Sequence, residues 1–177
     1  MLLNSQINMP RTPQITVIGN AEATPEQYQI SVEVGQTIAE LGFIAITGGR
    51  GGVMEAVAKG VQDKGGICVG ILPSGSHRDG NAYNTITIPT GIGHARNSMT
   101  VLAADIVIAI GGGAGTLSEL AFAWVYDKPV IAYQGIEGWA NELAERRLDG
   151  RRGDKILAFS DVAELEDLLK GLVGSSL

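Results

Sequence analysis

Two glycine-rich segments of this sequence have the residue types of loops that bind phosphate. One is TGGRGGVM at residues 47–54, and the other is GGGAGTLSE at residues 111–119. Glycine lets the backbone approach a ligand closely, and the free N–H groups at a helix start attract anions. Each segment joins an apolar run to a helical pattern, so both could hold a phosphate group through backbone donors. The first could instead be a tight turn with a solvated arginine, but four glycines exceed what a turn requires.

A few charged or polar side chains could complete such a site. Arg50 lies within the first loop, where it could donate a charge-assisted hydrogen bond to an anion. Thr116 offers a hydroxyl at the second helix start, and Glu119 follows one helical turn later. Arg96, in GHARN at residues 93–97, could face the same cleft. Considered alone, Arg96 would more often be a surface residue, and Glu119 could instead serve only as a dipole or capping partner of the helix. The predicted ligand-binding residues are Gly48, Gly49, Arg50, Gly51, Gly52, Arg96, Asn97, Gly112, Gly113, Ala114, Gly115, Thr116 and Glu119.

Several other binding and catalytic patterns are absent from the sequence. There is no Gly-x-x-x-x-Gly-Lys-Ser/Thr loop, which excludes a P-loop ATPase. Neither glycine loop has the Gly-x-Gly-x-x-Gly spacing, and no acidic residue follows the second strand, so NAD binding is disfavoured. No Gly-x-Ser-x-Gly elbow joins a strand to a helix. The single cysteine, Cys68, is expected in the core, and His94 is interpreted as a loop residue. With only one cysteine and two histidines, we expect no metal site.

Charge and composition narrow the classes of partner. The chain has 177 residues and a net charge of −6, so a general nucleic-acid binder is not expected. An anionic ligand must then be held locally, by backbone amides and a few arginines. The start of the chain does not have the pattern of a signal peptide, and the most apolar stretch, residues 101–126, is too interrupted for a membrane span. One cysteine fits a reducing compartment, and we expect a cytoplasmic protein.

The elements that must position the loops alternate along the chain. Apolar runs predict strands at residues 14–19, 43–47, 67–72, 85–88, 106–110, 130–133 and 156–159. Helical patterns lie between them, at residues 25–41, 53–64, 95–103, 115–126 and 139–148, with a last helix ending at 172. Near-continuous apolar strands alternating with helices predict an α/β, Rossmann-like fold, with a mostly parallel sheet of about seven strands and helices on both faces. We expect a poorly ordered tail at residues 1–13 and a single domain at 14–177.

The segments GGRGGVMEAVAKG, GHARN and IGGGAGTLSEL together resemble the SLOG superfamily, once labelled "possible lysine decarboxylases". The resemblance covers about residues 14–172. Two branches of the superfamily compete. The lonely-guy enzymes are cytokinin-nucleotide phosphoribohydrolases with the patterns Met-x-x-Arg-Lys and Pro-Gly-Gly-x-Gly-Thr-x-x-Glu. The molybdenum cofactor carrier proteins share the fold but store and protect a pterin cofactor. The resemblance gives Arg96 and Glu119 the positions of the enzyme's catalytic arginine and glutamate.

Three positions depart from the enzyme patterns: Gly93 replaces the methionine, Asn97 the lysine and Gly111 the proline. The glycine triplet, GHARN and the short length resemble the carrier branch. That resemblance implies a non-catalytic protein that binds, protects and delivers molybdenum cofactor to molybdoenzymes such as nitrate reductase. The cofactor's phosphate would lie near residues 112–116 and Arg96, and its pterin and molybdate end toward residues 48–52.

Two alternatives to the carrier function stay open. The first is a phosphoribohydrolase acting on nucleoside 5′-monophosphates, in which Glu119 stabilises an oxocarbenium-like centre and Arg96 orients the phosphate. The second is a nucleotide-sensing module with neither role. The old decarboxylase label finds no support, because no lysine stands in the glycine loops to hold pyridoxal phosphate.

The resemblance also implies a homo-oligomer, a dimer or a tetramer. Leu102, Leu120 and Trp124 are candidate residues for a helical interface, with the domain core as the equal alternative.

Overall fold

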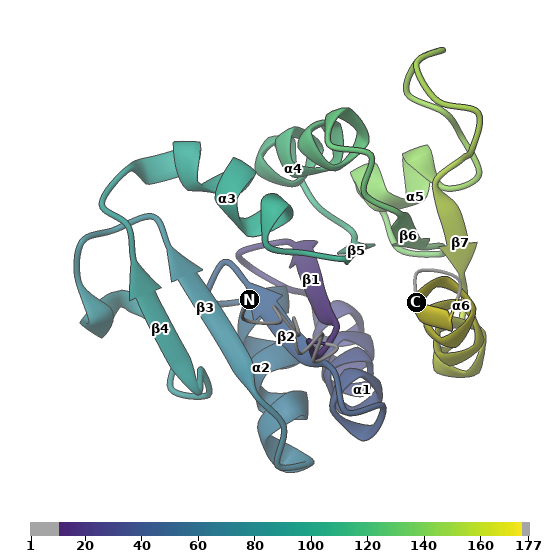
Figure 1. Ribbon diagram of the computed structural model, residues 1–177. Coiled ribbons are helices and arrows are strands. Elements are labelled where there is room, and N and C mark those ends of the chain that lie inside the picture. Colours follow the sequence, from purple (N-terminus) through teal and green to yellow (C-terminus); the bar gives the residue numbers. More distant parts are fainter. Residues whose placement is uncertain (1–10, 175–177) are drawn as a thin grey trace, which may run out of the picture.

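The computed structural model describes residues 11–174 as a seven-stranded parallel sheet with helices on both faces (Figure 1). The strand order is β4-β3-β2-β1-β5-β6-β7, and every neighbouring pair is parallel. This confirms the predicted α/β, Rossmann-like fold. The strands are β1 Gln14–Gly19, β2 Ile44–Thr47, β3 Cys68–Leu72, β4 Ile86–Pro89, β5 Ile106–Ile110, β6 Val130–Tyr133 and β7 Leu157–Phe159. The helices are α1 Pro25–Glu40, α2 Val53–Asp63, α3 Arg96–Leu102, α4 Ala114–Val125, α5 Trp139–Leu143 and α6 Val162–Gly174, with short 3₁₀ turns η1 His77–Asp79 and η2 Gly93–Ala95.

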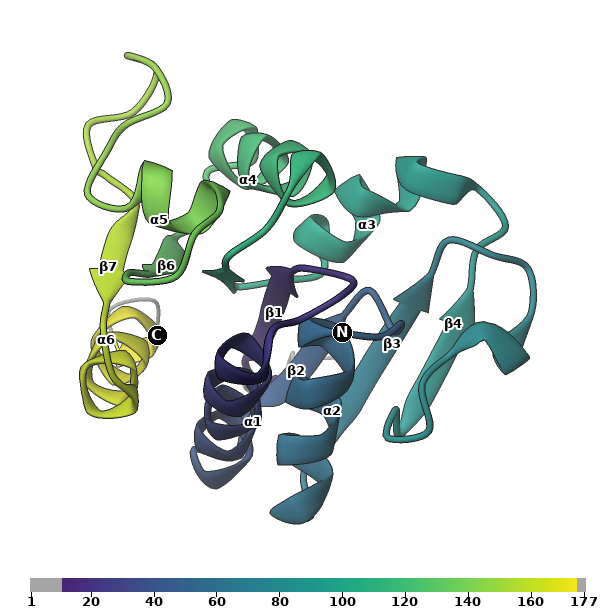
Figure 2. The ribbon, with the colours of Figure 1, turned by 180° about the vertical axis from the view of Figure 1, so that it is seen from behind.

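Alternate residues of the central strands fill two cores, one on each face of the sheet. In β5, Ile106, Ile108 and Ile110 belong to the core under α1, α2 and α6, which Figure 2 shows in front of the sheet. Val107 and Ala109 belong to the other core, with α4 and α5. The period of two arises because successive side chains of a strand point to opposite faces. Both faces of the sheet are therefore covered, and its carboxyl edge is left to the connecting loops.

A capping box forms the start of α1. The Thr24 hydroxyl accepts from the Gln27 N–H at 3.2 Å, and Gln27 Oε1 accepts from the Thr24 N–H at 3.0 Å. Pro25 occupies the first turn, where its missing N–H costs no hydrogen bond. These contacts fix the direction in which the chain leaves β1.

The helix predicted at residues 139–148 is shorter than expected, because it ends at Leu143. Glu145 has a φ of +62° and donates its N–H to Ile156 O, so the chain turns away into a projecting loop. The three candidate interface residues differ in burial. Leu120 and Trp124 lie in the core, whereas Leu102 is 51% exposed.

Of the tail predicted at residues 1–13, residues 1–10 lie outside the described part of the chain. Arg11 pairs with Asp105 at the amino end of β5. Within residues 11–174, no helix has the length and apolar character needed to cross a membrane.

Candidate functional site

The candidate site is a cleft at the carboxyl edge of the sheet, where the strand order reverses between β1 and β5. Crevices at such reversals are the usual ligand sites of open parallel sheets. The cleft has a volume of about 310 Å³. Both glycine loops and the start of α3 contribute to it. Its lining residues are Val17, Ile18, Gly19, Asn20, Ala21, Gly48, Arg50, Met54, Pro73, His94, Arg96, Asn97, Gly113, Gly115, Thr116 and Glu119.

Most of the first glycine loop, between β2 and α2, is packed against the protein. Gly52 has a φ of +66°, and a Cβ there would collide with the backbone oxygen of Asn20. That oxygen accepts from the N–H of Val53 at 2.9 Å, while the Gly49 N–H donates to Thr47 Oγ1 at 3.0 Å. These two amides therefore have partners within the protein. Of the five predicted residues of this loop, Gly48 and Arg50 line the cleft, and the other three do not.

Two asparagines between β3 and β4 hold the first loop from the outer side. Asn81 donates its N–H to Gly49 O and its Nδ2 to Arg50 O, each at 2.9 Å. Asn84 Nδ2 donates to Gly49 O at 3.0 Å. The loop that carries Arg50 is thus fixed by two side chains from the segment between β3 and β4.

The second glycine loop, between β5 and α4, is more open. Gly113 precedes α4, and no side chain among the described residues caps the helix start. A Cβ on Gly113 or Gly115 would have no neighbour within 4 Å. Gly112 differs, because its N–H donates to Asn20 Oδ1 at 2.6 Å. The Gly112 amide therefore already has a partner within the protein. Ala114 begins α4 but does not line the cleft.

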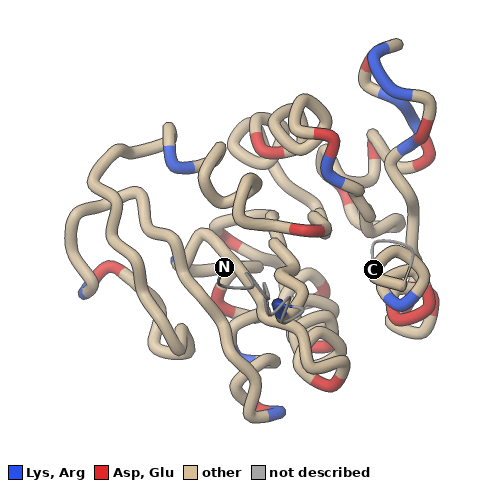
Figure 3. Tube along the Cα trace, viewed as in Figure 1, with Lys and Arg blue, Asp and Glu red and all other residues tan. Residues whose placement is uncertain are grey.

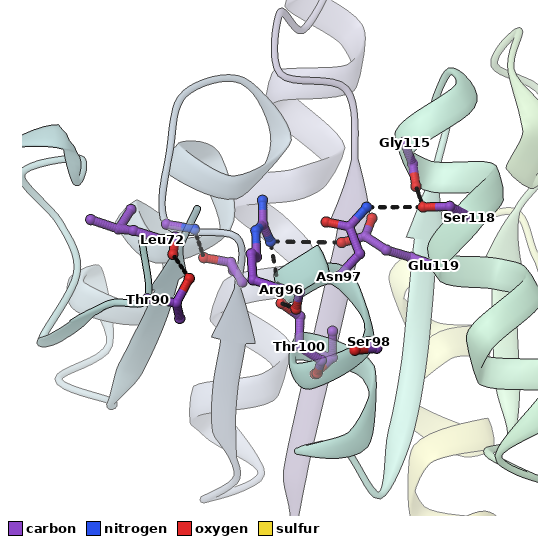
Figure 4. Close-up of polar contacts among 12 residues, drawn as sticks. Leu72, Thr90, Arg96, Asn97, Ser98, Thr100, Gly115, Ser118 and Glu119 are labelled. Atoms are coloured by element: carbon purple, nitrogen blue, oxygen red, sulfur yellow. Dashed lines mark hydrogen bonds and ion pairs between the residues drawn. The ribbon is translucent and has the colours of Figure 1, made fainter. Parts of the chain in front are cut away.

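Arg96 and Glu119 form a buried ion pair in the floor of the cleft (Figure 4). Each residue is 8% exposed, and Arg96 Nη1 lies 3.7 Å from Glu119 Oε1. Nη1 also donates to Thr100 Oγ1 at 3.2 Å. Arg96 Nε is buried and has no partner among the described residues. The guanidinium lies against Gly48, since a Cβ there would be 2.5 Å from Nη1.

Burial changes the acid–base behaviour of this pair. It raises the pKa of Glu119 to about 7, although the charge of Arg96 opposes the shift. Burial also lowers the pKa of Arg96, which Glu119 opposes and the nearby Arg50 reinforces. Loss of solvation by both groups outweighs their attraction at 3.7 Å. Glu119 can thus gain or lose a proton near neutral pH while the arginine stays charged.

Asn97 ties α3 to α4 beside the ion pair. Its Nδ2 donates to Ser118 Oγ at 2.9 Å, and Ser118 Oγ donates to Gly115 O at 2.6 Å (Figure 4). The two helix starts that flank the cleft are therefore held together by a short chain of hydrogen bonds.

Basic residues do not form a broad surface around the cleft. Figure 3 shows several of them in the projecting loop before β7, whereas the start of α3 carries a single basic segment. That loop contains Arg146, Arg147, Arg151 and Arg152. Among the residues described, no cluster of three His, Cys, Asp or Glu side chains could hold a metal ion.

Comparison with known proteins shows to which family the chain belongs. The model of the SLOG cluster4 family matches residues 12–165. The chain belongs to that family. Its structure is similar to that of the molybdenum cofactor binding protein from the phototrophic bacterium Rippkaea orientalis, with 36% identity and a TM-score of 0.84, over 93% of this chain and 99% of that one. It is also similar to the molybdenum cofactor carrier protein of Chlamydomonas reinhardtii, with 32% identity and a TM-score of 0.81 over the same shares.

A curated relative points to the other branch of the superfamily. The cytokinin riboside 5′-monophosphate phosphoribohydrolase of Mycobacterium tuberculosis is 30% identical over 137 residues, which cover 68% of this chain and 72% of that protein. The expected SLOG membership is thus confirmed. Both branches of the superfamily include proteins that are similar to this chain.

Part of the cleft of this SLOG cluster4 protein is formed by residues that the sequence did not predict. Asn20 and Ala21 follow β1, Pro73 follows β3, and Met54 lies in the first turn of α2. His94 was interpreted as a loop residue, and it is an exposed residue of η2 that lines the cleft. For Asn20 the available signal was its place directly after a central strand.

Proposed function

We propose that this protein binds, protects and delivers molybdenum cofactor, with the cofactor's phosphate held in the cleft. The phosphate lies at the start of α4, near Gly113, Gly115 and Thr116, with Arg96 beside it. The pterin and molybdate end extends toward Gly48 and Arg50. In this role the protein shelters its cargo from water and oxygen and then passes it to an acceptor molybdoenzyme such as nitrate reductase.

The observation that carries this proposal is the meeting of both glycine loops and two arginines in one cleft. Its residues suit an anion. An uncapped helix start offers backbone N–H groups, and Arg96 Nε is buried without a partner among the described residues. A volume of about 310 Å³ is near the lower end for small-molecule sites, so a long ligand extends out of the cleft.

Two further observations favour a carrier over an enzyme. The similar structures from Rippkaea orientalis and Chlamydomonas reinhardtii align with this chain over 99% of their own length. They are named as a molybdenum cofactor binding protein and a molybdenum cofactor carrier protein. Gly111 has a φ of +60°, whereas proline is fixed near −65°. The loop therefore has a conformation that the proline of the phosphoribohydrolase pattern cannot adopt.

The test is to purify the protein without oxygen from cells that make the cofactor and measure bound molybdenum and pterin. We expect both in about equal amounts, and we expect the protein to reactivate cofactor-free nitrate reductase. Arg96→Ala should lose most of the bound cofactor. Arg151→Ala is the matched control, because this exposed arginine pairs with Asp149 outside the cleft. Wild-type protein without molybdenum or pterin would contradict the proposal.

The second candidate is a phosphoribohydrolase that hydrolyses the N-glycosidic bond of nucleoside 5′-monophosphates. One observation favours it: burial raises the pKa of Glu119 to about 7, a value suited to acid–base chemistry at neutral pH. Incubation with AMP or a cytokinin riboside monophosphate should release free base if this candidate holds. Glu119→Gln should then abolish the release.

We further propose that the protein is cytoplasmic and forms a homo-oligomer, a dimer or a tetramer. Exposed apolar side chains on α3 and α4 support association, since Met99, Leu102 and Val125 are 44%, 51% and 48% exposed. Light scattering after size-exclusion chromatography gives the mass, and a monomer at all concentrations would overturn this proposal.

A further inference from the structure

Asn20 lies at the centre of a chain of hydrogen bonds that joins α1 to the second glycine loop. Its Oδ1 accepts from the Gly112 N–H at 2.6 Å and from Gln27 Nε2 at 3.2 Å. Gln27 Oε1 in turn accepts from the Thr24 N–H at 3.0 Å. Gly111 makes room for this arrangement, because a Cβ there would lie 2.6 Å from both Asn20 Oδ1 and Gln27 Nε2.

These hydrogen bonds determine the positions of the oxygen and the nitrogen of the Asn20 side-chain amide. A backbone N–H can only donate, so the Gly112 amide requires the oxygen of Asn20. The Thr24 N–H likewise requires the oxygen of Gln27, which leaves the nitrogen of Gln27 to face Asn20. Backbone donors at both ends thus determine both amide orientations without any choice between nitrogen and oxygen.

The nitrogen of Asn20 is left as an available donor. Asn20 lines the cleft together with Arg96 and Thr116. Within residues 11–174, its side chain forms hydrogen bonds through Oδ1 alone, and Nδ2 has no partner. The residue is only partly buried, and its Nδ2 is not among the fully buried polar atoms that lack a partner within residues 11–174. A primary amide nitrogen carries two hydrogens and accepts no hydrogen bond, which suits an anionic oxygen.

We infer that Asn20 Nδ2 donates a hydrogen bond to the phosphate of the bound ligand, with the α1 capping box holding the amide in that orientation. This inference rests on the proposed function, because it requires a phosphate group in the cleft. It assigns Asn20 two tasks: Oδ1 fixes the second glycine loop through Gly112, and Nδ2 contacts the ligand.

Asn20→Asp separates the two tasks. The aspartate oxygen still accepts from Gly112 and Gln27, so the fold is kept, but the donor is replaced by a carboxylate oxygen. The affinity for inorganic phosphate should fall at least about tenfold, the usual scale for a hydrogen bond to a charged group. Ala21→Asp is the matched control. It adds the same charge at the neighbouring cleft-lining, exposed residue and removes no donor. We expect about a two- to threefold loss for this control, because exposed charges are screened.

The experiment is an NMR titration of ¹⁵N-labelled full-length protein with inorganic phosphate, which gives affinities and the Asn20 side-chain NH₂ signals together. In wild type these signals should shift as phosphate saturates the cleft. Equal losses for Asn20→Asp and Ala21→Asp, or NH₂ signals that stay still while phosphate binds, would overturn this inference and leave the proposed function standing. Should wild-type protein bind no phosphate at all, both fail. The wild-type signals decide the matter even if a variant does not fold.

Discussion

The two glycine loops have similar composition, but Gly52 of the first and Gly113 and Gly115 of the second serve different purposes. In the first loop, Gly52 has a φ of +66° and would collide with Asn20 if it carried a side chain. In the second, a Cβ on Gly113 or Gly115 would meet nothing within 4 Å, and neither has a positive φ. The fold requires the first kind of glycine, whereas it leaves the second kind free. We propose that the open glycines at the helix start let a ligand approach closely, whereas the packed glycines serve the fold itself.

The largest effect is expected for Gly52→Ala. Both the left-handed backbone and the contact with the oxygen of Asn20 oppose a side chain, so the free energy of unfolding should fall by about 3 kcal/mol or more. Urea denaturation measures this loss. A loss below about 1 kcal/mol would show that the first loop is not constrained as described.

Glu119 lies in α4, the helix that follows the second glycine loop, and it should make the stability of the protein depend on pH. Burial raises its pKa from 4.5 to about 7, so between these values the folded protein binds more protons than the unfolded chain. Its contribution is thus fully present below about pH 4.5 and is lost as pH rises through about 7. Wild type loses this contribution between pH 5 and pH 8, whereas Glu119→Gln has none to lose. The free energy of unfolding of the variant minus that of wild type should therefore rise by about 2 kcal/mol over this pH range. Parallel curves for the two proteins would count against the raised pKa.

Gly48→Ala should affect binding more than stability, because Gly48 belongs to the packed loop but faces the cleft. A Cβ there would be 2.5 Å from Arg96 Nη1 and 2.6 Å from Met54 Sδ, both ends of flexible side chains. The fold should survive, while the displaced guanidinium weakens phosphate binding about tenfold. Calorimetric titration with phosphate measures the affinity. Unchanged affinity would remove Arg96 from the ligand contacts.

The smallest effect is expected for Gly115→Ala. The free energy of unfolding should stay the same or rise by about 0.5 kcal/mol, because alanine favours helices and has space here. Phosphate affinity should fall several-fold, since the new methyl group stands where the ligand approaches. If binding were unaffected, the open glycines of the second loop would lose their functional explanation.

The sequence predicts the parts of this molecule that depend on local patterns. The capping box of Thr24 and Gln27, the buried strands and the position of both glycine loops follow from residue types a few positions apart. The same local reasoning predicted a longer α5, and it could not foresee the turn at Glu145.

The contacts that decide which amides are free depend on tertiary structure. Asn20 reaches Gly112 across 92 positions of the sequence, and Asn84 reaches Gly49 across 35. No spacing rule indicates such pairs. For this reason the sequence placed Gly112 among the ligand-binding amides, although the protein itself uses that N–H.

In the proposed site, the open start of α4 and the buried Arg96 bind one phosphate group in the same cleft. A crystal structure of the protein grown in phosphate tests it most directly. We predict one phosphate in contact with Arg96 and with the backbone N–H groups of the first turn of α4. Phosphate bound only elsewhere on the surface, with this cleft left empty, would show that the cleft is not a phosphate site.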